Sequence, residues 1–178
     1  MKILAEPLRG AFLIEARCHE DARGDFVKTY HRSAFFEMGI SFTPAESFYS
    51  TSRREVIRGM HFQTPPAAHA KVVYCISGRV MDVVLDLRKS SPTYGQAVSH
   101  ELSRENHRQF FIPIGVAHGF LSLDENSVLV YATDTVHSPS HDAGVRWDSF
   151  GFDWETREPL VSPRDAGFPD LTDFVSPF

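Results

Sequence analysis

The chain has 178 residues, 42% of them hydrophobic and 12% aromatic, so it can bury one sizeable core but is too short for two domains to be expected. Its 15 phenylalanines supply large rings to bury and argue against disorder. A formal net charge of −5 argues against a general nucleic-acid binder, so an anionic ligand requires a local cluster of positive side chains.

Taken in chain order, the predicted elements are short apolar stretches separated by turn residues, which is typical of β-sandwiches and barrels. Helices are scarce: one is predicted at 33–38, where Gly39 ends it, and one near Pro163. The predicted strands are 47–50, 56–62, 72–76, 79–87, 97–102, 109–112, 120–122 and 128–133. The sequence therefore predicts an all-β fold with a few short helices.

Two strands in the middle of the chain carry further predictions. The dipeptide Ser77-Gly78 separates 72–76 from 79–87 and predicts a tight hairpin turn. Alternate apolar residues in 79–87 predict a face that packs in the core, while Asp82 and Asp86 predict a polar face.

The rest of the chain indicates one domain over residues 1–178, with a less regular tail after about Gly144. No repeat, low-complexity tract or Pro/Gly-rich linker divides it. Cys18 and Cys75 show neither a disulfide framework nor a zinc-type spacing, and Cys75 is expected to pack as a small hydrophobe. No apolar run approaches the length of a membrane span, so we expect no membrane association and a cytoplasmic location.

Residues able to carry chemistry gather around one predicted strand. His61 follows Arg58 and Gly59, and a bulge at the glycine would place both side chains on one sheet face; without it they point to opposite faces. Lys71 and His118 add an ammonium and a second imidazole. Together they can remove a proton from a carbon next to a carbonyl on an anionic substrate and hold the negative charge that forms.

Each of these residues also has a structural explanation. A lone strand histidine is usually structural, Lys71 can occupy a sheet edge, and His118 in a Pro-x-Gly-x-x-His turn can close a loop by a hydrogen bond. Asp165 follows Ser162 by three residues, which is typical of a helix-capping arrangement. Tyr131 lies in an apolar run, where a tyrosine commonly packs in the core.

Over most of its length the chain resembles the dTDP-4-dehydrorhamnose 3,5-epimerase family of nucleotide-sugar enzymes, which have a cupin-like jelly-roll fold. The matching residues occur in the family's order and spacing. They are the segments 21–26, 58–63, 82–88, 91–95, 113–120 and 144–147, with Lys71 and Tyr131.

The resemblance implies the catalytic residues. His61 would be the base, paired with Asp165, and Tyr131 would be the acid that returns a proton from the opposite face of the sugar. Lys71 would stabilise the enolate oxygen. The chemistry agrees, because imidazole alone is too weak a base to form an enolate without a positive neighbour, and inversion needs a donor on the other face.

The resemblance also implies how the substrate is held. Arg58 and His118 would hold the diphosphate or the adjoining sugar together with Arg23, Gln63 would also contact the substrate, and Phe26 would lie against the nucleotide base. Phe26 would come from the partner of a homodimer whose subunits exchange strands. The implied substrate is a nucleoside-diphosphate-linked 4-keto sugar in carbohydrate biosynthesis, such as that of O-antigen. No cofactor and no metal are expected, since the substrate ketone is the electron sink.

Four positions on the substrate side depart from the family pattern, and one of them is Lys28, which stands where an acidic residue is frequent. Glu46 and Phe48 stand where a glutamine and an asparagine are common, and His137 stands where a tyrosine is common. These departures bear on recognition more than on proton transfer. They leave open whether the nucleotide is dTDP, CDP or GDP and whether C3, C5 or both are inverted.

Two other classes of function fit parts of the pattern. A metal-dependent cupin dioxygenase or isomerase would use His61, His69 and His118 as ligands, but the usual His-x-His pair followed by glutamate is missing. A non-catalytic sugar-binding jelly roll would have no need of a base, an acid and an oxyanion partner together.

Overall fold

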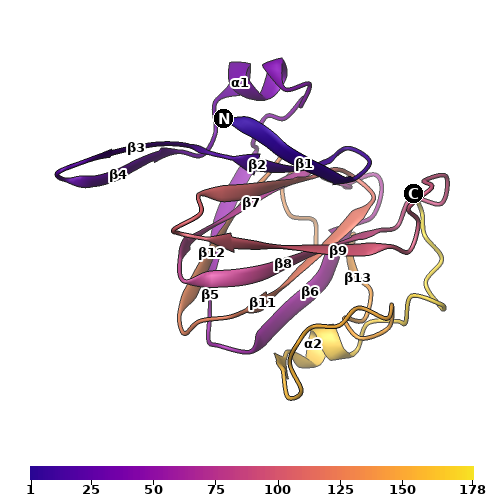
Figure 1. The fold of residues 1–178 in the computed structure, drawn as a ribbon. Coiled ribbons are helices and arrows are strands. Elements are labelled where there is room, and N and C mark those ends of the chain that lie inside the picture. The colour runs from indigo at the N-terminus through magenta and orange to yellow at the C-terminus, as the bar shows by residue number, and fades with distance from the viewer.

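The computed structural model describes residues 1–178 and consists mainly of two facing β-sheets (Figure 1). The first sheet is antiparallel and has, in spatial order, β1 (Lys2–Leu8), β2 (Ala11–Glu15), β10 (Arg108–Ile112), β7 (Lys71–Ser77), β12 (Ser127–Thr133) and β5 (Glu46–Ser52). The second has β13 (Asp142–Gly144), β6 (Val56–Gln63), β11 (Val116–Ser122), β8 (Arg79–Asp86) and β9 (Ala97–Ser103), with β14 (Leu160–Val161) parallel to β6. This is the predicted all-β, cupin-like jelly roll.

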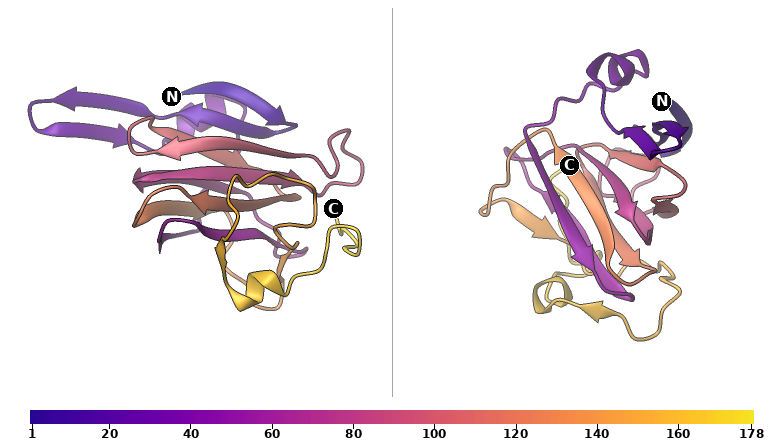
Figure 2. Two further views of the ribbon diagram at one scale, coloured as in Figure 1. Left: turned by 60° about the horizontal axis from the view of Figure 1, so that its bottom comes forward. Right: turned by 90° about the vertical axis from the view of Figure 1, so that its left-hand side faces the viewer.

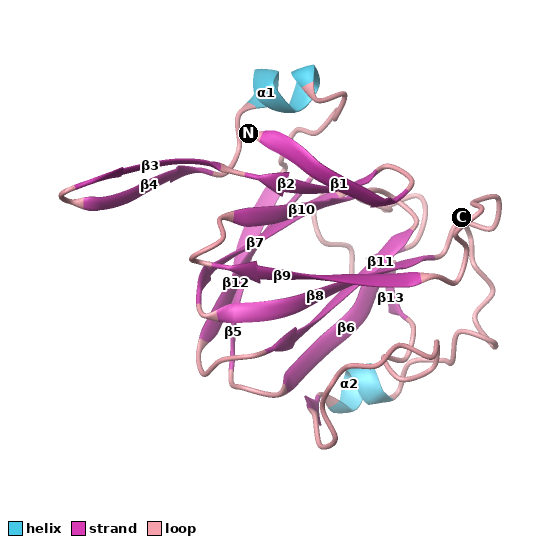
Figure 3. Ribbon diagram, viewed as in Figure 1, coloured by secondary structure: helices cyan, strands magenta, loops and turns pink.

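Helices are confined to two short segments, as Figure 3 shows. The helix α1 (Arg32–Glu37) ends before Gly39, whose φ of +79° suits a residue without a side chain. The helix α2 (Pro163–Ala166) begins after Ser162 with proline at its first position. Both predicted helices are confirmed, and neither is long and apolar enough to cross a membrane.

All eight predicted strands are present, as β5 to β12. Their ends lie within two residues of the prediction, except that β11 begins at Val116 instead of residue 120. Six strands were not predicted, namely β1, β2, β13, β14 and the pair β3 (Arg17–Asp21) and β4 (Gly24–Lys28).

The predicted hairpin at Ser77-Gly78 is wrong. β7 pairs with β10 and β12 in the first sheet, whereas β8 pairs with β9 and β11 in the second, so this turn carries the chain from one sheet to the other. Gly78 is still required there, because its φ is +68° and an added Cβ would lie 2.7 Å from Ser127 Oγ.

The prediction of a polar face on β8 also needs correction, because both faces of this strand are buried. Asp82 and Asp86 are only 1% and 0% exposed. Asp82 faces the space between the sheets and contacts His118, while Asp86 accepts hydrogen bonds from Arg88, Ser91 and Thr93. Bonded partners make these buried carboxylates tolerable, although their alternation in the sequence resembles that of a solvated face.

Three apolar clusters hold the layers together. One fills the space between the sheets and includes Val73, Phe110 and Leu129. A second covers the outer face of the second sheet with residues of the C-terminal segment, such as Trp154 and Phe178. The third packs Phe35, Ile40 and Phe42 from the α1 region on the outer face of the first sheet. Both sheets are therefore buried on two sides over much of their area.

The hairpin of β3 and β4 stands apart from both sheets. These two strands pair only with each other and project beyond the body as an arm, which is clear in Figure 1 and in the left-hand view of Figure 2. Most of their side chains are exposed, including Phe26 at 63%.

Candidate active site

A cavity of about 270 Å³ lies between the two sheets, where polar side chains replace the apolar ones of the core. Its walls come from β5, β6, β7, β11, β12 and β13, from α2 and from the loops after β6 and β12. The lining residues are Phe48, Ser50, Arg58, His61, Phe62, Gln63, His69, Lys71, His118, Phe120, Tyr131, Thr133, His137, Asp142 and Arg164.

A bulge in β6 places Arg58 and His61 on the same side of the sheet. His61 pairs with His118 and Arg58 pairs with Phe120, so three steps along β6 match two steps along β11. Gly59 makes this possible: its φ is +143°, and an added Cβ would lie 2.5 Å from the Cα of Gly119. Of the two alternatives that the sequence left open at Gly59, the structure has the bulge.

His61 is bonded to a buried carboxylate behind it. Its Nε2 lies 2.9 Å from Oδ1 of Asp165, which is 3% exposed, and the other carboxylate oxygen accepts a hydrogen bond from Gly59 N at 3.1 Å. Burial alone would raise the pKa of Asp165, but the bonds from His61, Gly59 and Ser162 outweigh it and hold this pKa below its usual value. Asp165 therefore stays ionised and can orient the imidazole.

The capping arrangement expected at this helix is present as well. Ser162 Oγ accepts a hydrogen bond from Asp165 N at 3.1 Å and thus caps α2. In a full capping box the carboxylate would bond back to the N–H of the cap residue, but the carboxylate of Asp165 bonds Gly59 and His61 instead. The Ser-x-x-Asp motif thus caps the helix through Ser162 and also places the Asp165 carboxylate against His61.

Lys71 is 6% exposed, and its Nζ lies in the cavity 3.3 Å from the backbone oxygen of His61, to which it donates. Burial lowers the pKa of this ammonium to about 8, and the charges of Asp82 and Asp142 counteract part of that effect. Lys71 is thus mostly charged at neutral pH and faces a cavity with few competing partners.

Tyr131 forms another wall of the cavity. Its ring stacks on Phe48, with centroids 4.7 Å apart, and its hydroxyl lies 3.2 Å from Ser50 Oγ. Burial raises the pKa of Tyr131 above its ordinary value, so the phenol keeps its proton at neutral pH. The residue is both packed, as the structural explanation required, and available to donate a proton.

His118, which was expected to hold either the diphosphate or the adjoining sugar, lies deep in the fold. It is 3% exposed, and its Nε2 lies 2.7 Å from Oδ2 of Asp82. Burial lowers the pKa of His118, although the charge and the hydrogen bond of Asp82 oppose this. His118 lines the floor of the cavity, where it can meet a sugar more readily than a diphosphate.

The expected substrate contacts occupy different places. Arg58 is exposed at the rim, where it donates to Ser52 Oγ and Thr51 O. Gln63 is 2% exposed, and its amide is used to hold the loops that follow β6 and β12. His137 lines the cavity, whereas Glu46 does not and instead accepts a hydrogen bond from His137 N.

Arg23 and Phe26 lie on the arm and outside this cavity. Arg23 is bonded to Asp21 at the tip of the hairpin. A single chain therefore does not bring these two residues together with His61. For Phe26 this agrees with the expectation that the residue reaches the site of the partner subunit.

Three cavity residues were not predicted as part of an epimerase site, and His69 was considered only as a metal ligand. His69 lies in the loop after β6, Asp142 in β13 and Arg164 in α2, where Asp142 accepts a hydrogen bond from Arg164. Burial lowers the pKa of His69 to about 3, so it is neutral. For Asp142 and Arg164 the only signal in the sequence is that both are charged residues in a region with little periodicity.

The three histidines considered as metal ligands all line the cavity but are not grouped as ligands. His61 bonds Asp165, His118 bonds Asp82 and His69 bonds Gln63. The only group of three His, Cys, Asp or Glu side chains with ligand atoms within 4.8 Å of one another lies elsewhere. The fold and the site thus define a class: a jelly roll whose cavity holds a carboxylate-bonded imidazole, a buried ammonium and a phenol, suited to proton transfer at carbon.

Comparisons with known proteins narrow this class. The family model for dTDP-4-dehydrorhamnose 3,5-epimerase matches residues 5–173. The dTDP-4-dehydrorhamnose 3,5-epimerase of Salmonella typhimurium is 37% identical over 175 residues, 96% of each chain. The dTDP-4-dehydrorhamnose 3-epimerase of Streptomyces niveus is 35% identical over 168 residues, 93% of this chain and 81% of that protein.

Solved structures agree. The dTDP-4-dehydrorhamnose 3,5-epimerase of Bacillus anthracis, crystallised with TDP and PPi bound, superposes with a TM-score of 0.93 and 35% identity over 96% of this chain and 99% of that one. The chain belongs to the dTDP-4-dehydrorhamnose 3,5-epimerase family, and it is accordingly an isomerase of the epimerase type.

Proposed function

We propose that this enzyme inverts C3 and C5 of a dTDP-linked 4-keto-6-deoxy sugar by removing a proton and returning it to the opposite face. The observation that carries the proposal is the His61–Asp165 pair, placed in one cavity with Lys71 and Tyr131. The family name and the nucleotide bound to the Bacillus anthracis relative favour dTDP over CDP or GDP.

In the proposed mechanism His61 removes the proton from the carbon next to the C4 ketone. Asp165 keeps the imidazole oriented and stabilises the imidazolium that forms. Lys71 faces the ketone oxygen and stabilises the negative charge of the enolate in a cavity where little water competes. Tyr131 then supplies a proton to the other face of the ring, and its raised pKa keeps it protonated until that step.

Substrate binding is assigned by position. Arg58, exposed at the rim, would contact the diphosphate, and His118 on the floor would contact the sugar. Phe48 adds an apolar wall against Tyr131 in place of a polar contact and thus constrains how the sugar lies. His137 would contact the nucleotide end of the substrate. The carboxylate of Glu46 keeps it in place by accepting a hydrogen bond from His137 N.

The assembly we propose is a homodimer in which the arm of each subunit reaches the partner's site. The support is that β3 and β4 leave the body and expose Phe26, whose apolar ring is poorly placed as a free surface. We also propose a single domain and a cytoplasmic location, since two unpaired cysteines suit a reducing compartment. A place in O-antigen or other deoxysugar biosynthesis stays a prediction.

The test is exchange of substrate hydrogens with solvent deuterium, followed by NMR. The wild-type enzyme should incorporate deuterium at C3 and C5 of the dTDP-linked 4-keto sugar, more efficiently than with the CDP- or GDP-linked sugars. His61→Asn should lower the exchange rate by about 10²–10⁴ while the folded structure stays intact. Deuterium exchange at nearly the wild-type rate in His61→Asn would contradict the assignment of His61 as the base.

A further inference from the structure

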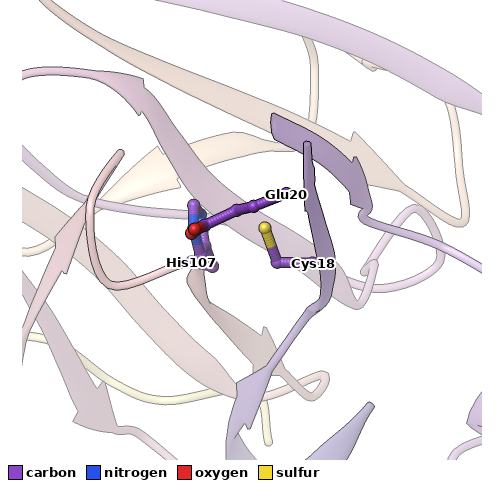
Figure 4. Close-up of side chains that lie close together, drawn as sticks. All are labelled: Cys18, Glu20 and His107. Carbon is purple, nitrogen blue, oxygen red and sulfur yellow. The ribbon is translucent and has the colours of Figure 1, made fainter. Parts of the chain in front are cut away.

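A second group of chemically active side chains lies at the root of the arm, away from the cavity (Figure 4). Cys18 and Glu20 come from β3, and His107 comes from the turn between β9 and β10. The Cys18 sulfur, a Glu20 carboxylate oxygen and a His107 ring nitrogen lie within 4.8 Å of one another. Because they alternate along the strand, Cys18 and Glu20 share a face that His19 does not share.

None of these three side chains makes a hydrogen bond or an ion pair within the chain. The neighbouring charges are instead paired with each other, since Arg104 donates to Asp25 at 2.8 Å. The turn is fixed in place: His107 has φ +50°, and its backbone oxygen accepts a hydrogen bond from Ala16 N at 3.0 Å. Three groups able to act as ligands are thus held together without another partner.

Their chemistry matches a borderline divalent cation. Thiolate, imidazole and carboxylate are the three ligand types that zinc takes in proteins, and a site with three protein ligands leaves a fourth tetrahedral position open. Zinc bonds of about 2.0–2.3 Å separate tetrahedral ligand atoms by roughly 3.3–3.6 Å, so small side-chain rotations from the observed spacing suffice. The thiolate and the carboxylate together balance the charge of the ion.

We propose that Cys18, Glu20 and His107 bind one zinc-class divalent cation that fastens the root of the arm to the β9–β10 turn. The fourth position takes water or a small ligand, and His107 also lines a neighbouring cavity of about 220 Å³. Phe26 lies opposite His19 in the arm, so it stays on the face that the cation does not cover. The site is independent of the proposed reaction.

The test uses Co²⁺ as the probe, added to reduced, chelator-treated protein. We expect one equivalent to produce the near-ultraviolet charge-transfer band of a cobalt–thiolate bond. Cys18→Ser should abolish the band. Glu20→Gln and His107→Asn should each weaken Co²⁺ binding by about 10-fold or more, because the loss of even a residue that hydrogen-bonds a metal ligand lowers metal affinity by at least this factor. Asparagine is chosen at position 107 because it tolerates the left-handed backbone there.

Matched controls separate this site from other ligands. Cys75→Ala removes the buried thiol, and His19→Gln removes an imidazole on the opposite face of β3; both should keep the band. Zn²⁺ should slow hydrogen exchange of β3 and β4 in the wild type but not in Cys18→Ser. Absence of the band in wild type, or its survival in Cys18→Ser, overturns the site, and unchanged exchange with the band present overturns the fastening of the arm.

Discussion

At the scale of single residues, Asp165 and Ser162 separate a structural role from a chemical one. Ser162→Ala removes the helix cap and should lower the free energy of unfolding by about 1 kcal/mol, with turnover per folded molecule unchanged. Asp165→Asn keeps the backbone N–H that bonds Ser162 but loses the charge beside His61. It should lower turnover by roughly 10² or more, since the imidazole is no longer held in the correct tautomer. Urea unfolding and exchange kinetics of both variants measure the two effects.

The opposite pattern of effects would contradict the proposed pairing of Asp165 with His61. If Asp165→Asn loses stability but keeps full turnover per folded molecule, the carboxylate serves the fold alone. If Ser162→Ala loses turnover as well, the two roles are not separable at this helix.

A second prediction concerns how the activity depends on pH through the charge of Lys71. Its pKa of about 8 means that the positive charge is present below this pH and is lost as the pH rises through it. The kcat/KM of the wild type, which reports the free enzyme, should therefore fall above pH 8. Tyr131 cannot produce this limb, because its pKa is raised above the ordinary value near 10.

Two variants check the assignment. Lys71→Met should lower kcat more than it raises KM, because the enolate charge appears only as the proton leaves. Lys71→Arg keeps the charge to much higher pH, so whatever activity it retains should not fall between pH 8 and 9. If the activity of Lys71→Arg falls above pH 8 in the same way as that of the wild type, the titration belongs to another group.

Residue chemistry in the site was predictable only in part. His61 and Tyr131 stand within predicted strands, Lys71 directly precedes one, and Gly59 indicated where a bulge could turn Arg58 and His61 to one side. Asp82 was placed on a polar face, because alternation along a strand does not reveal whether a carboxylate has a buried partner such as His118. His69 and Arg164 come from segments without periodicity, so no local pattern placed them in the cavity.

At the scale of elements, the arm carries the proposal that two subunits build each site. A chain with His61→Ala can be co-assembled with one that carries Arg23→Ala and Phe26→Ala. If the arm acts in the partner's site, each mixed dimer regains one complete site, and an equal mixture recovers about one quarter of wild-type activity. If the arm acts in its own chain, no complete site forms. Activity no higher than the sum of the separate variants therefore rules out exchange of the arm.

The elements themselves were predictable where an apolar pattern exists. The strands β5 to β12 bury at least part of one face and were found to within two residues, apart from the start of β11. The arm strands β3 and β4 expose most of their side chains, so they lack the alternation that marks a half-buried strand. The turn at Gly78 was recognised, but a tight turn does not show whether the next strand joins the same sheet or the facing one.

At the scale of the whole molecule, the jelly roll acts as a rigid frame that brings residues distant in sequence to one cavity. His61 lies on β6 in one sheet, Lys71 and Tyr131 lie on β7 and β12 in the other, and Asp165 comes from α2 in the tail. The proposed base, His61, and the proposed acid, Tyr131, thus stand on facing sheets. This is the arrangement that inversion needs, because the sugar between them must lose a proton on one side and gain it on the other.

In the proposed mechanism Tyr131 completes inversion after His61 has removed the proton. The most direct test is NMR of the wild-type and Tyr131→Phe reactions in deuterium oxide, scored separately at C3 and C5. We expect Tyr131→Phe still to exchange hydrogen for deuterium but to return it with retention at the centre that Tyr131 serves, so that inverted product is lost there. Inverted product forming at the wild-type rate at both centres in Tyr131→Phe would contradict the role of Tyr131 as the proton donor.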